Sequence, residues 1–165
     1  MPKIDPDQVP AQTDSVYPEP YSGQMTGRTT RRLGELAGLT QFGVNLVTLE
    51  PGAVASLRHW HLNEDEFAIV VAGQLTLVED EGETPMSPGD CAAWKAGVAN
   101  GHRFINRSDA PASFLVVGSK APAEVATYSD VDLQLHIKGG DLRFTYHDGS
   151  DWAGHRDIAP RGERK

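Results

Sequence analysis

Short runs in which apolar and polar residues alternate dominate the middle of the chain. A period of two is typical of β-strands that bury one face. Helical periodicity is scarce, and the best helical segment is a short one at residues 29–36. Weaker alternation at 132–137 and 142–146 leads us to expect segments that cover the main fold or pair with a partner subunit. The alternation predicts strands at residues 41–49, 54–61, 66–71, 74–79, 91–94, 102–106 and 112–118.

Turn residues separate these predicted strands. The chain contains 17 glycines and 11 prolines, spread along the sequence. Pro51-Gly52, Pro88-Gly89 and Asn100-Gly101 are strong turn pairs, and Gly73 and Gly82 stand between neighbouring runs. Many short strands at this spacing indicate an all-β fold, either a sandwich or a closed barrel.

The length of 165 residues fits one domain that can bury an apolar core without disulfides. We divide the chain into an N-terminal arm and lead-in (1–39), a barrel core (40–120) and a C-terminal extension (121–165). The arm is rich in proline, aspartate and glutamine, and the tail after Trp152 is polar, so we expect it to be mobile. No internal repeat is visible, which predicts a single copy of the fold.

Acidic residues outnumber basic ones, 23 against 15, for a formal net charge of -8. This balance disfavours nucleic acid and anionic membranes as partners, although a few local arginines could still bind an anionic small molecule. The sequence shows neither a signal peptide nor an apolar run that could span a membrane, and we expect a cytoplasmic protein. The single cysteine, Cys91, allows no internal disulfide, and we expect it to be a small buried residue rather than a reactive thiol.

Residues 59–66 carry the clearest chemistry. His59 and His61 lie two apart on a predicted strand, so they face the same side. A polar turn then returns the chain, and Glu66 opens the next strand close to them. His102 begins a later strand after a turn and could supply a third imidazole. Three imidazoles and one carboxylate can hold a divalent metal ion and leave positions open for water or substrate.

The same residues carry a resemblance to a known family. The first cupin motif reads here as Gly52, six residues, His59-x-His61, four residues, Glu66, six residues and Gly73. The second reads as Gly89, five residues, Lys95-x-Gly97, four residues, His102, three residues and Asn106. Relative to the motifs, the first gap is one residue longer, Lys95 replaces a proline, and two extra residues precede His102. Over residues 40–118 the chain therefore resembles the cupin superfamily.

The whole chain further resembles a group of small single-domain bacterial cupins, whose members are often labelled sugar-phosphate isomerases. The resemblance implies a double-stranded β-helix, or jelly-roll barrel, and a homodimer. It also implies one divalent ion inside the barrel, with Zn, Mn, Fe and Ni all open as its identity. The implied metal ligands are His59, His61, Glu66 and His102. The marks shared with the group lie at residues 39–43, 58–61, 64–67 and 106–108.

Three basic residues, Arg58, Lys95 and Arg103, lie nearest these motifs in the sequence. They are candidates to bind an anionic group of a substrate. Strand alternation turns Arg58 and Arg103 away from the histidines, so we expect all three to be solvated. We expect Trp60 to pack in the barrel wall, and the role of Trp94 is open.

Three functions remain in view. The first is a metal-dependent isomerase or epimerase of a small polar substrate such as a sugar or sugar phosphate, in which an enediolate is stabilised while a proton moves between carbons. Glu66 would ligate the metal or act as the base. The second is an iron-dependent dioxygenase with an apolar cavity. The third is a barrel that binds a small ligand without catalysis. We rank the isomerase first on the family resemblance, and whether the protein is an enzyme stays open.

Overall fold

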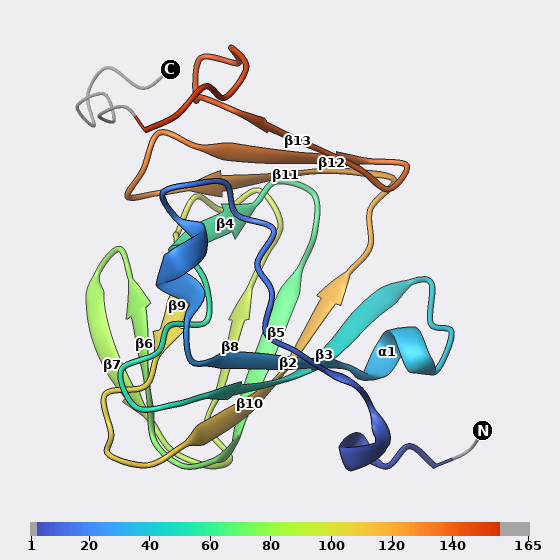
Figure 1. Ribbon diagram of the computed structural model, residues 1–165, viewed down its shortest axis with the longest axis vertical. Coiled ribbons are helices and arrows are strands. Elements are labelled where there is room, and N and C mark those ends of the chain that lie inside the picture. Colours follow the sequence, from blue (N-terminus) through green and yellow to red (C-terminus); the bar gives the residue numbers. More distant parts are fainter. Residues whose placement is uncertain (1–2, 156–165) are drawn as a thin grey trace.

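The protein is described by a computed structural model over residues 3–155, in which antiparallel strands form three sheets and helices are confined to single turns (Figure 1). The helical turns are Pro6–Gln8, Ser22–Met25 and α1 (Leu33–Leu36). In spatial order, the six-stranded sheet contains β1 (Ala11–Gln12), β2 (Arg28–Arg32), β3 (Phe42–Leu49), β10 (Ala112–Ser119), β5 (Glu66–Ala72) and β8 (Cys91–Trp94). The four-stranded sheet contains β13 (Asp141–Thr145), β12 (Gln134–Lys138), β11 (Ala123–Tyr128) and β4 (His59–His61). The three-stranded sheet contains β7 (Gly82–Met86), β6 (Leu75–Glu79) and β9 (Arg103–Ile105).

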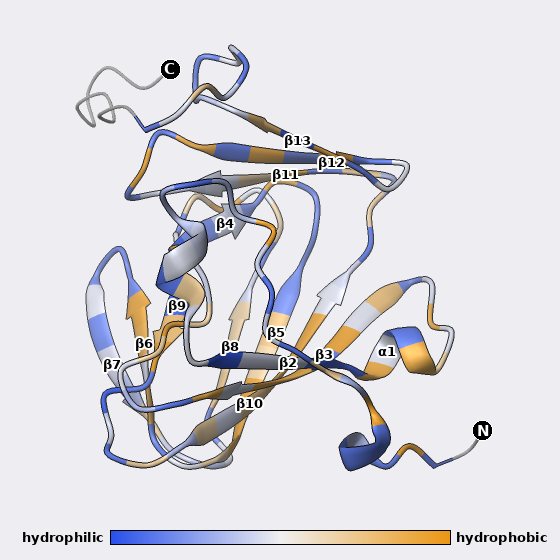
Figure 2. Ribbon diagram, viewed as in Figure 1, coloured by the Kyte–Doolittle hydropathy of each residue, from blue (hydrophilic) through white to orange (hydrophobic). Residues whose placement is uncertain are grey.

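The main apolar core lies between the six-stranded and three-stranded sheets. Val70 of β5 and Phe114 of β10 pack in one buried cluster with Leu77 of β6 and Phe104 of β9. Figure 2 shows the hydrophobic stretches of β3 and β6 that contribute to it. Each large side chain buried there contributes about 1.5–3 kcal/mol relative to an exposed position. The core thus holds two of the sheets face to face.

A second apolar cluster holds the four-stranded sheet at one end of the molecule. Tyr21 and Met25, from the N-terminal segment, pack there with Leu133 and Leu135 from the C-terminal part of the chain. The strand β4 belongs to this sheet because its residues pair antiparallel with β11, His59 with Tyr128 among them. The C-terminal strands therefore position the two histidines of β4.

The all-β class predicted from the sequence is confirmed, and the predicted strands at 41–49, 66–71, 74–79, 91–94, 102–106 and 112–118 are present with small shifts in their ends. Within 54–61, only the last three residues form a strand, while Val54 makes an isolated bridge to Ile105. The helix predicted at 29–36 is reduced to one turn, because residues 28–32 pair along β3 instead. Over residues 3–155 the three sheets do not join into one closed barrel.

Two further predictions concern Cys91 and the tail after Trp152. Cys91 is exposed, so its predicted burial is wrong: it begins β8, which lies at the edge of its sheet and pairs only with β5. Most of the polar tail predicted after Trp152 lies outside the described residues. None of the helices in the described part of the chain is long and apolar enough to cross a membrane.

Candidate metal centre

Three of the four predicted ligands form a compact group. His59 and His61 face the same side of β4, with ring centroids 4.9 Å apart, and Glu66 begins β5 beside them. The nearest ligand atoms of the three side chains all lie within 4.8 Å of one another. His61 Nε2 is 3.2 Å from Glu66 Oε2. Strand alternation and the short turn between β4 and β5 therefore bring these groups together as the sequence suggested.

The fourth predicted ligand, His102, lies at the edge of this group. Its side chain is buried, and Nε2 is 3.5 Å from Glu66 Oε1. The backbones of His59 and His102 exchange two hydrogen bonds, of 2.9 and 3.2 Å, so the residues before His102 do not carry it away from the site. The four side chains come from all three sheets, because His102 directly precedes β9.

Two imidazole nitrogens in this group suggest that it is built for an ion. His61 Nδ1 and His102 Nε2 are buried and have no hydrogen-bond partner among the described residues. A buried nitrogen without a partner costs about 1–3 kcal/mol, and coordination of an ion by His102 Nε2 would remove that cost there. His61 Nδ1 faces Glu124, which leaves its Nε2 for the ion. Imidazole and carboxylate donors suit divalent first-row metals. The residues present therefore fit one divalent ion.

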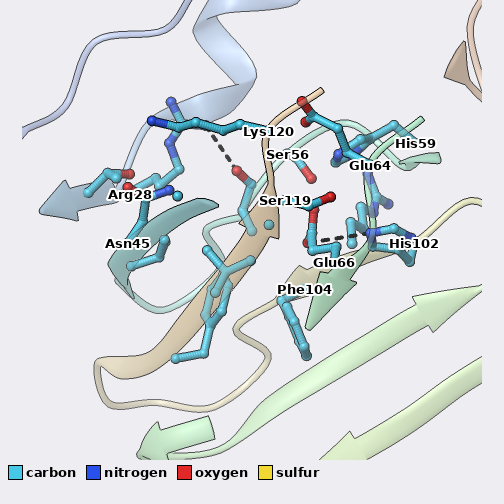
Figure 3. Close-up of a pocket in the computed structure, with 18 residues that line it drawn as sticks. Arg28, Asn45, Ser56, His59, Glu64, Glu66, His102, Phe104, Ser119 and Lys120 are labelled. Atoms are coloured by element: carbon cyan, nitrogen blue, oxygen red, sulfur yellow. Dashed lines mark hydrogen bonds and ion pairs between the residues drawn. The ribbon is translucent and has the colours of Figure 1, made fainter. Parts of the chain in front are cut away.

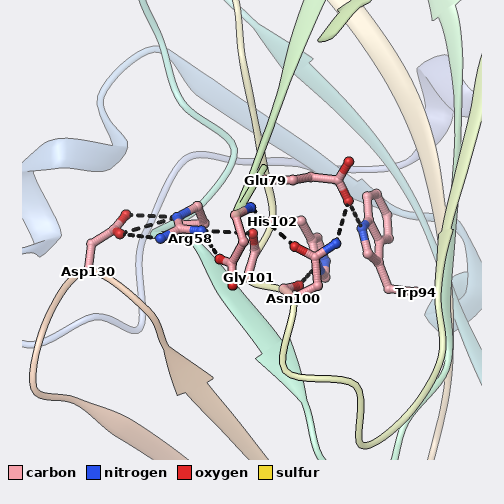
Figure 4. Close-up of polar contacts among 8 residues, drawn as sticks. Arg58, Glu79, Trp94, Asn100, Gly101, His102 and Asp130 are labelled. Carbon is pink, nitrogen blue, oxygen red and sulfur yellow. Dashed lines mark hydrogen bonds and ion pairs between the residues drawn. The ribbon is translucent and has the colours of Figure 1, made fainter. Parts of the chain in front are cut away.

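A hydrogen-bonded network behind His102 sets the orientation of its ring (Figure 4). Trp94 stacks on the imidazole, with ring centroids 3.7 Å apart. Glu79 Oε1 accepts hydrogen bonds of 2.9 Å from both Trp94 Nε1 and Asn100 Nδ2. The backbone oxygen of Asn100 lies 3.3 Å from His102 Nδ1. This arrangement directs the other ring nitrogen, Nε2, toward Glu66.

A buried carboxylate that the sequence analysis did not identify lies behind His61. Glu124 on β11 is 2% exposed and accepts 2.8 Å hydrogen bonds from the backbone N–H groups of Leu62 and Asn63. Its Oε1 is 3.5 Å from His61 Nδ1. Partners of this kind orient a ligating histidine and raise its basicity. No motif marks Glu124, because antiparallel pairing of β11 with β4 brings it to the site.

The charges of the group are strongly coupled. Burial, assisted by the neighbouring His61 and His102, lowers the pKa of His59 to about 3. Burial also disfavours a charged His61, but Glu124 and Glu66 outweigh this and raise its pKa to about 10. Burial acts against ionised Glu66 as well, yet His102 and His61 hold its pKa far below the usual range. Without an ion, the site therefore contains a neutral His59, a protonated His61 and an ionised Glu66.

A cavity of about 320 Å³ leads to these residues (Figure 3). His59, Glu66 and His102 line one side of it, together with the carboxylate of Glu64. Phe104 and other apolar residues form part of the floor. The cavity therefore combines ligand atoms with both polar and apolar walls.

The three basic residues near the motifs, Arg58, Lys95 and Arg103, were expected to be solvated, and the structure places them in three different surroundings. Arg103 lines the cavity of the metal centre, although alternation was expected to turn it away. Arg58 does point away: its Nη2 lies 2.6 Å from Asp130, and its guanidinium also pairs with Asp80. Lys95 is exposed and does not line this cavity. Two cations absent from the motifs, Arg28 and Lys120, do line it.

Trp60, between the two histidines of β4, faces the opposite direction. It lines a separate cavity of about 800 Å³ together with Arg58 and Asp130. It is half-buried there and does not belong to either apolar cluster. The two faces of β4 therefore serve two different cavities.

Comparisons with known proteins show what the chain is similar to. The profile described as "Cupin domain" matches residues 45–118. A solved structure of a sugar phosphate isomerase from a cupin superfamily, from Silicibacter pomeroyi, is 53% identical and covers 92% of this chain and 97% of its own, with a TM-score of 0.90. A candidate sugar phosphate isomerase from Acidithiobacillus ferrooxidans is 25% identical over 76% of this chain and 80% of its own, with a TM-score of 0.69.

A more distant solved structure shares the fold alone. The polyketide cyclase RemF from Streptomyces resistomycificus is 22% identical, covers 72% of this chain and 79% of its own, and has a TM-score of 0.60. A search of the curated proteins gave no match.

Proposed function

This chain belongs to the cupin family, and from that premise we propose that it is a metal-dependent isomerase or epimerase of a small sugar or sugar phosphate. The observation that carries the proposal is the convergence of His59, Glu66 and His102 at one side of a cavity of about 320 Å³, with His61 Nε2 3.2 Å from Glu66 Oε2. The name of the Silicibacter pomeroyi protein, which is similar over almost the whole chain, supports the same reaction class.

Family membership also leads us to propose several properties beyond the coarse fold. The three sheets together would correspond to the jelly roll typical of the family, without closing into one hydrogen-bonded barrel over residues 3–155. The protein would act as a homodimer in the cytoplasm, on a small-molecule substrate and without a nucleic-acid or membrane partner. The donors leave the identity of the ion open among Zn, Mn, Fe and Ni.

In this proposal His59, His61, Glu66 and His102 hold one divalent ion, which when bound supplies Lewis-acid polarisation of neighbouring carbonyl and hydroxyl oxygens. Glu66 serves as a ligand, because its two oxygens face His61 and His102 at 3.2 and 3.5 Å. Glu124 and Trp94 hold two of the imidazoles in orientation.

Glu64 is the carboxylate best placed to move a proton. It lines the cavity beside His59, and its Oε1 accepts a 2.8 Å hydrogen bond from the backbone N–H of Ala121, while within residues 3–155 its other oxygen accepts none. Burial raises the pKa of Glu64, which brings the carboxyl closer to the range in which it can both accept and return a proton. In an isomerisation it would accept the proton from the carbon that bears the hydroxyl group and return it to the neighbouring carbon.

Elemental analysis and isotope exchange test this function. Wild-type protein should contain close to one metal ion per chain, and His61→Ala and His102→Ala should lose it, while the control His136→Ala keeps it. His136 is a suitable control because its ring bonds to Thr145, away from the site. Incubation with small aldose and ketose phosphates in D₂O should place deuterium on the carbon next to the carbonyl. Glu64→Gln should abolish this exchange and retain the metal.

The iron-dependent dioxygenase is a second candidate because of one observation. Apolar side chains that include Val47, Phe104, Phe114 and Val116 line part of the cavity, and such a wall suits a less polar substrate. Protein that contains iron, consumes oxygen with substrate and shows no deuterium exchange would replace the isomerase with this reaction. Protein that takes up no metal after reconstitution would contradict both enzymes.

A further inference from the structure

The cavity of the metal centre has a positively charged side that the proposed chemistry does not use. Arg28 on β2 and Lys120, which follows the last residue of β10, line the cavity on the side away from His59 and His102 (Figure 3). Arg103 also lines the cavity. These cations come from segments that the cupin motifs do not include, apart from Arg103.

The charge of these residues is uncompensated, unlike that of most other arginines within residues 3–155. Four arginines on other surfaces have a carboxylate oxygen within 4.0 Å. They are Arg32, Arg58, Arg107 and Arg143. Across residues 3–155, no carboxylate lies within that distance of Arg28, Arg103 or Lys120. In a chain with a net charge of -8, this creates a local positive potential inside the cavity.

The guanidinium of Arg28 is held in place but keeps donors to spare. Its Nη1 and Nη2 donate 2.9 Å hydrogen bonds to the backbone oxygens of Ala55 and Asp14. Its Nε is buried without a partner among the described residues. Because a guanidinium has more N–H donors than these two bonds use, Arg28 can still bind an anion with a fixed geometry. A backbone carbonyl contributes only a dipole, so the positive charge itself remains.

The opposite side of the cavity has the opposite charge. Glu64 and Glu66 lie with the histidines, so an anionic group would be repelled there and attracted to Arg28 and Lys120. Ser119 adds a neutral polar group between the two sides, and Asn45 lies beside Arg28. The cavity therefore favours an elongated ligand with one anionic end and one uncharged, oxygen-bearing end.

We propose that Arg28 and Lys120 bind the phosphate of a phosphomonoester substrate and so present its carbonyl end to the metal centre. A phosphate monoester is preferred to a carboxylate because it carries about −1.5 to −2 charge at neutral pH, which several uncompensated cations match better than a single negative charge. This inference rests on the proposed function. It narrows the substrate class of the isomerase from sugars and sugar phosphates to sugar phosphates that bind in one orientation.

Titration of inorganic phosphate, followed by calorimetry, tests this subsite directly. Wild type should bind phosphate both with metal and after removal of the metal by a chelator. Arg28→Gln and Lys120→Gln should each weaken the phosphate Kd at least tenfold, with the metal content unchanged. The control Arg107→Gln should leave the phosphate Kd as it is, because Arg107 is exposed and paired with Glu83.

Several results would overturn the subsite. One is an equal phosphate affinity in wild type and both variants. Another is phosphate binding that occurs only when the metal is present. A third is that acetate binds as tightly as phosphate. Arg28→Gln could disturb folding because Arg28 bonds to two backbone carbonyls, whereas Lys120 is exposed and Lys120→Gln keeps the test valid.

The two proposals fail in different ways. Protein that binds metal at the predicted residues but not phosphate would contradict the subsite alone. Protein that lacks metal but shows phosphate binding sensitive to Lys120→Gln would contradict the isomerase and leave the anion subsite standing.

Discussion

The indole of Trp94 and the imidazole of His102 are stacked almost in parallel, with planes 8° apart and ring centroids separated by 3.7 Å. Trp94 is itself fixed by its hydrogen bond to Glu79. The stack holds the plane of the His102 ring, so that Nε2 faces Glu66 rather than the core. A tryptophan of the apolar core therefore determines the direction of a predicted metal ligand.

Substitution of Trp94 should weaken metal binding. Trp94→Leu removes both the stack and the hydrogen bond to Glu79, so we expect metal affinity to fall by about 10–100-fold. Trp94→Phe keeps a ring against His102 and should lose less. Competition with a chromophoric chelator measures the change. Trp60→Leu is the matched control, since Trp60 faces the other cavity, and an equal loss in this variant would contradict the assigned role.

Substitution of Glu124 should affect both metal binding and stability. Glu124→Gln removes the charge near His61 Nδ1, and we expect metal affinity to fall by about 10–100-fold. The amide can accept from only one of the backbone groups of Leu62 and Asn63, so unfolding free energy should fall by about 1–3 kcal/mol. Urea unfolding measures the second effect. The exposed Glu83→Gln should change neither quantity, and unchanged metal affinity in Glu124→Gln would refute the orienting role.

Metal uptake should release protons. The pKa of His61 is raised to about 10, so His61 is protonated at neutral pH and must lose its proton to ligate an ion. His59, with a pKa of about 3, and the ionised Glu66 contribute none. Titration of metal into weakly buffered protein should therefore release a proton from His61 for each ion bound. Apparent affinity should rise as the pH increases toward the pKa of His61 and level off above it.

The proton release has its own control. His61→Asn lacks the imidazole and should not take up the ion, so the release seen in this variant is the background that is unrelated to metal binding. Release from wild type no greater than this background, although the ion binds, would show that His61 is not protonated before the metal binds.

The turn before His102 requires a glycine at position 101. A Cβ there would lie 2.0 Å from Ser129 Oγ and 2.8 Å from its Cβ, so Gly101→Ala should lower the unfolding free energy by about 1–3 kcal/mol. Ser129→Gly in the same chain should recover most of the loss, which urea unfolding of both variants would show. Gly23→Ala has open space around it and should be nearly neutral. A Gly101→Ala protein as stable as wild type would contradict this contact.

Much of the site could be predicted because its determinants are local. His59, His61 and Glu66 are placed by strand alternation and one short turn, which a sequence pattern describes well. His102 lies far along the chain, and its placement followed from a second motif whose spacing to Asn106 is preserved. The buried Asn106 donates to the backbone oxygens of Leu49 and Ala110, which gives that spacing a structural reason.

The rest of the site depends on long-range pairing that no local pattern encodes. Glu124 reaches His61 because β11 pairs with β4, and Arg28 reaches the cavity because β2 pairs with β3. The register of such pairs is set by burial across the whole sheet. For the same reason, residues 28–32 form a strand despite a weak helical pattern. Charged residues that complete a site from distant strands are therefore the ones that sequence analysis misses.

The four predicted ligands come from three sheets, and this has a consequence for unfolding. The four-stranded sheet is held mainly by its own apolar cluster, separate from the main core. An ion shared by β4, β5 and the start of β9 would cross-link both clusters, so that neither could open while the other stayed closed. In the loaded protein the two clusters would then melt as one cooperative unit, whereas the metal-free protein would lose the four-stranded sheet first.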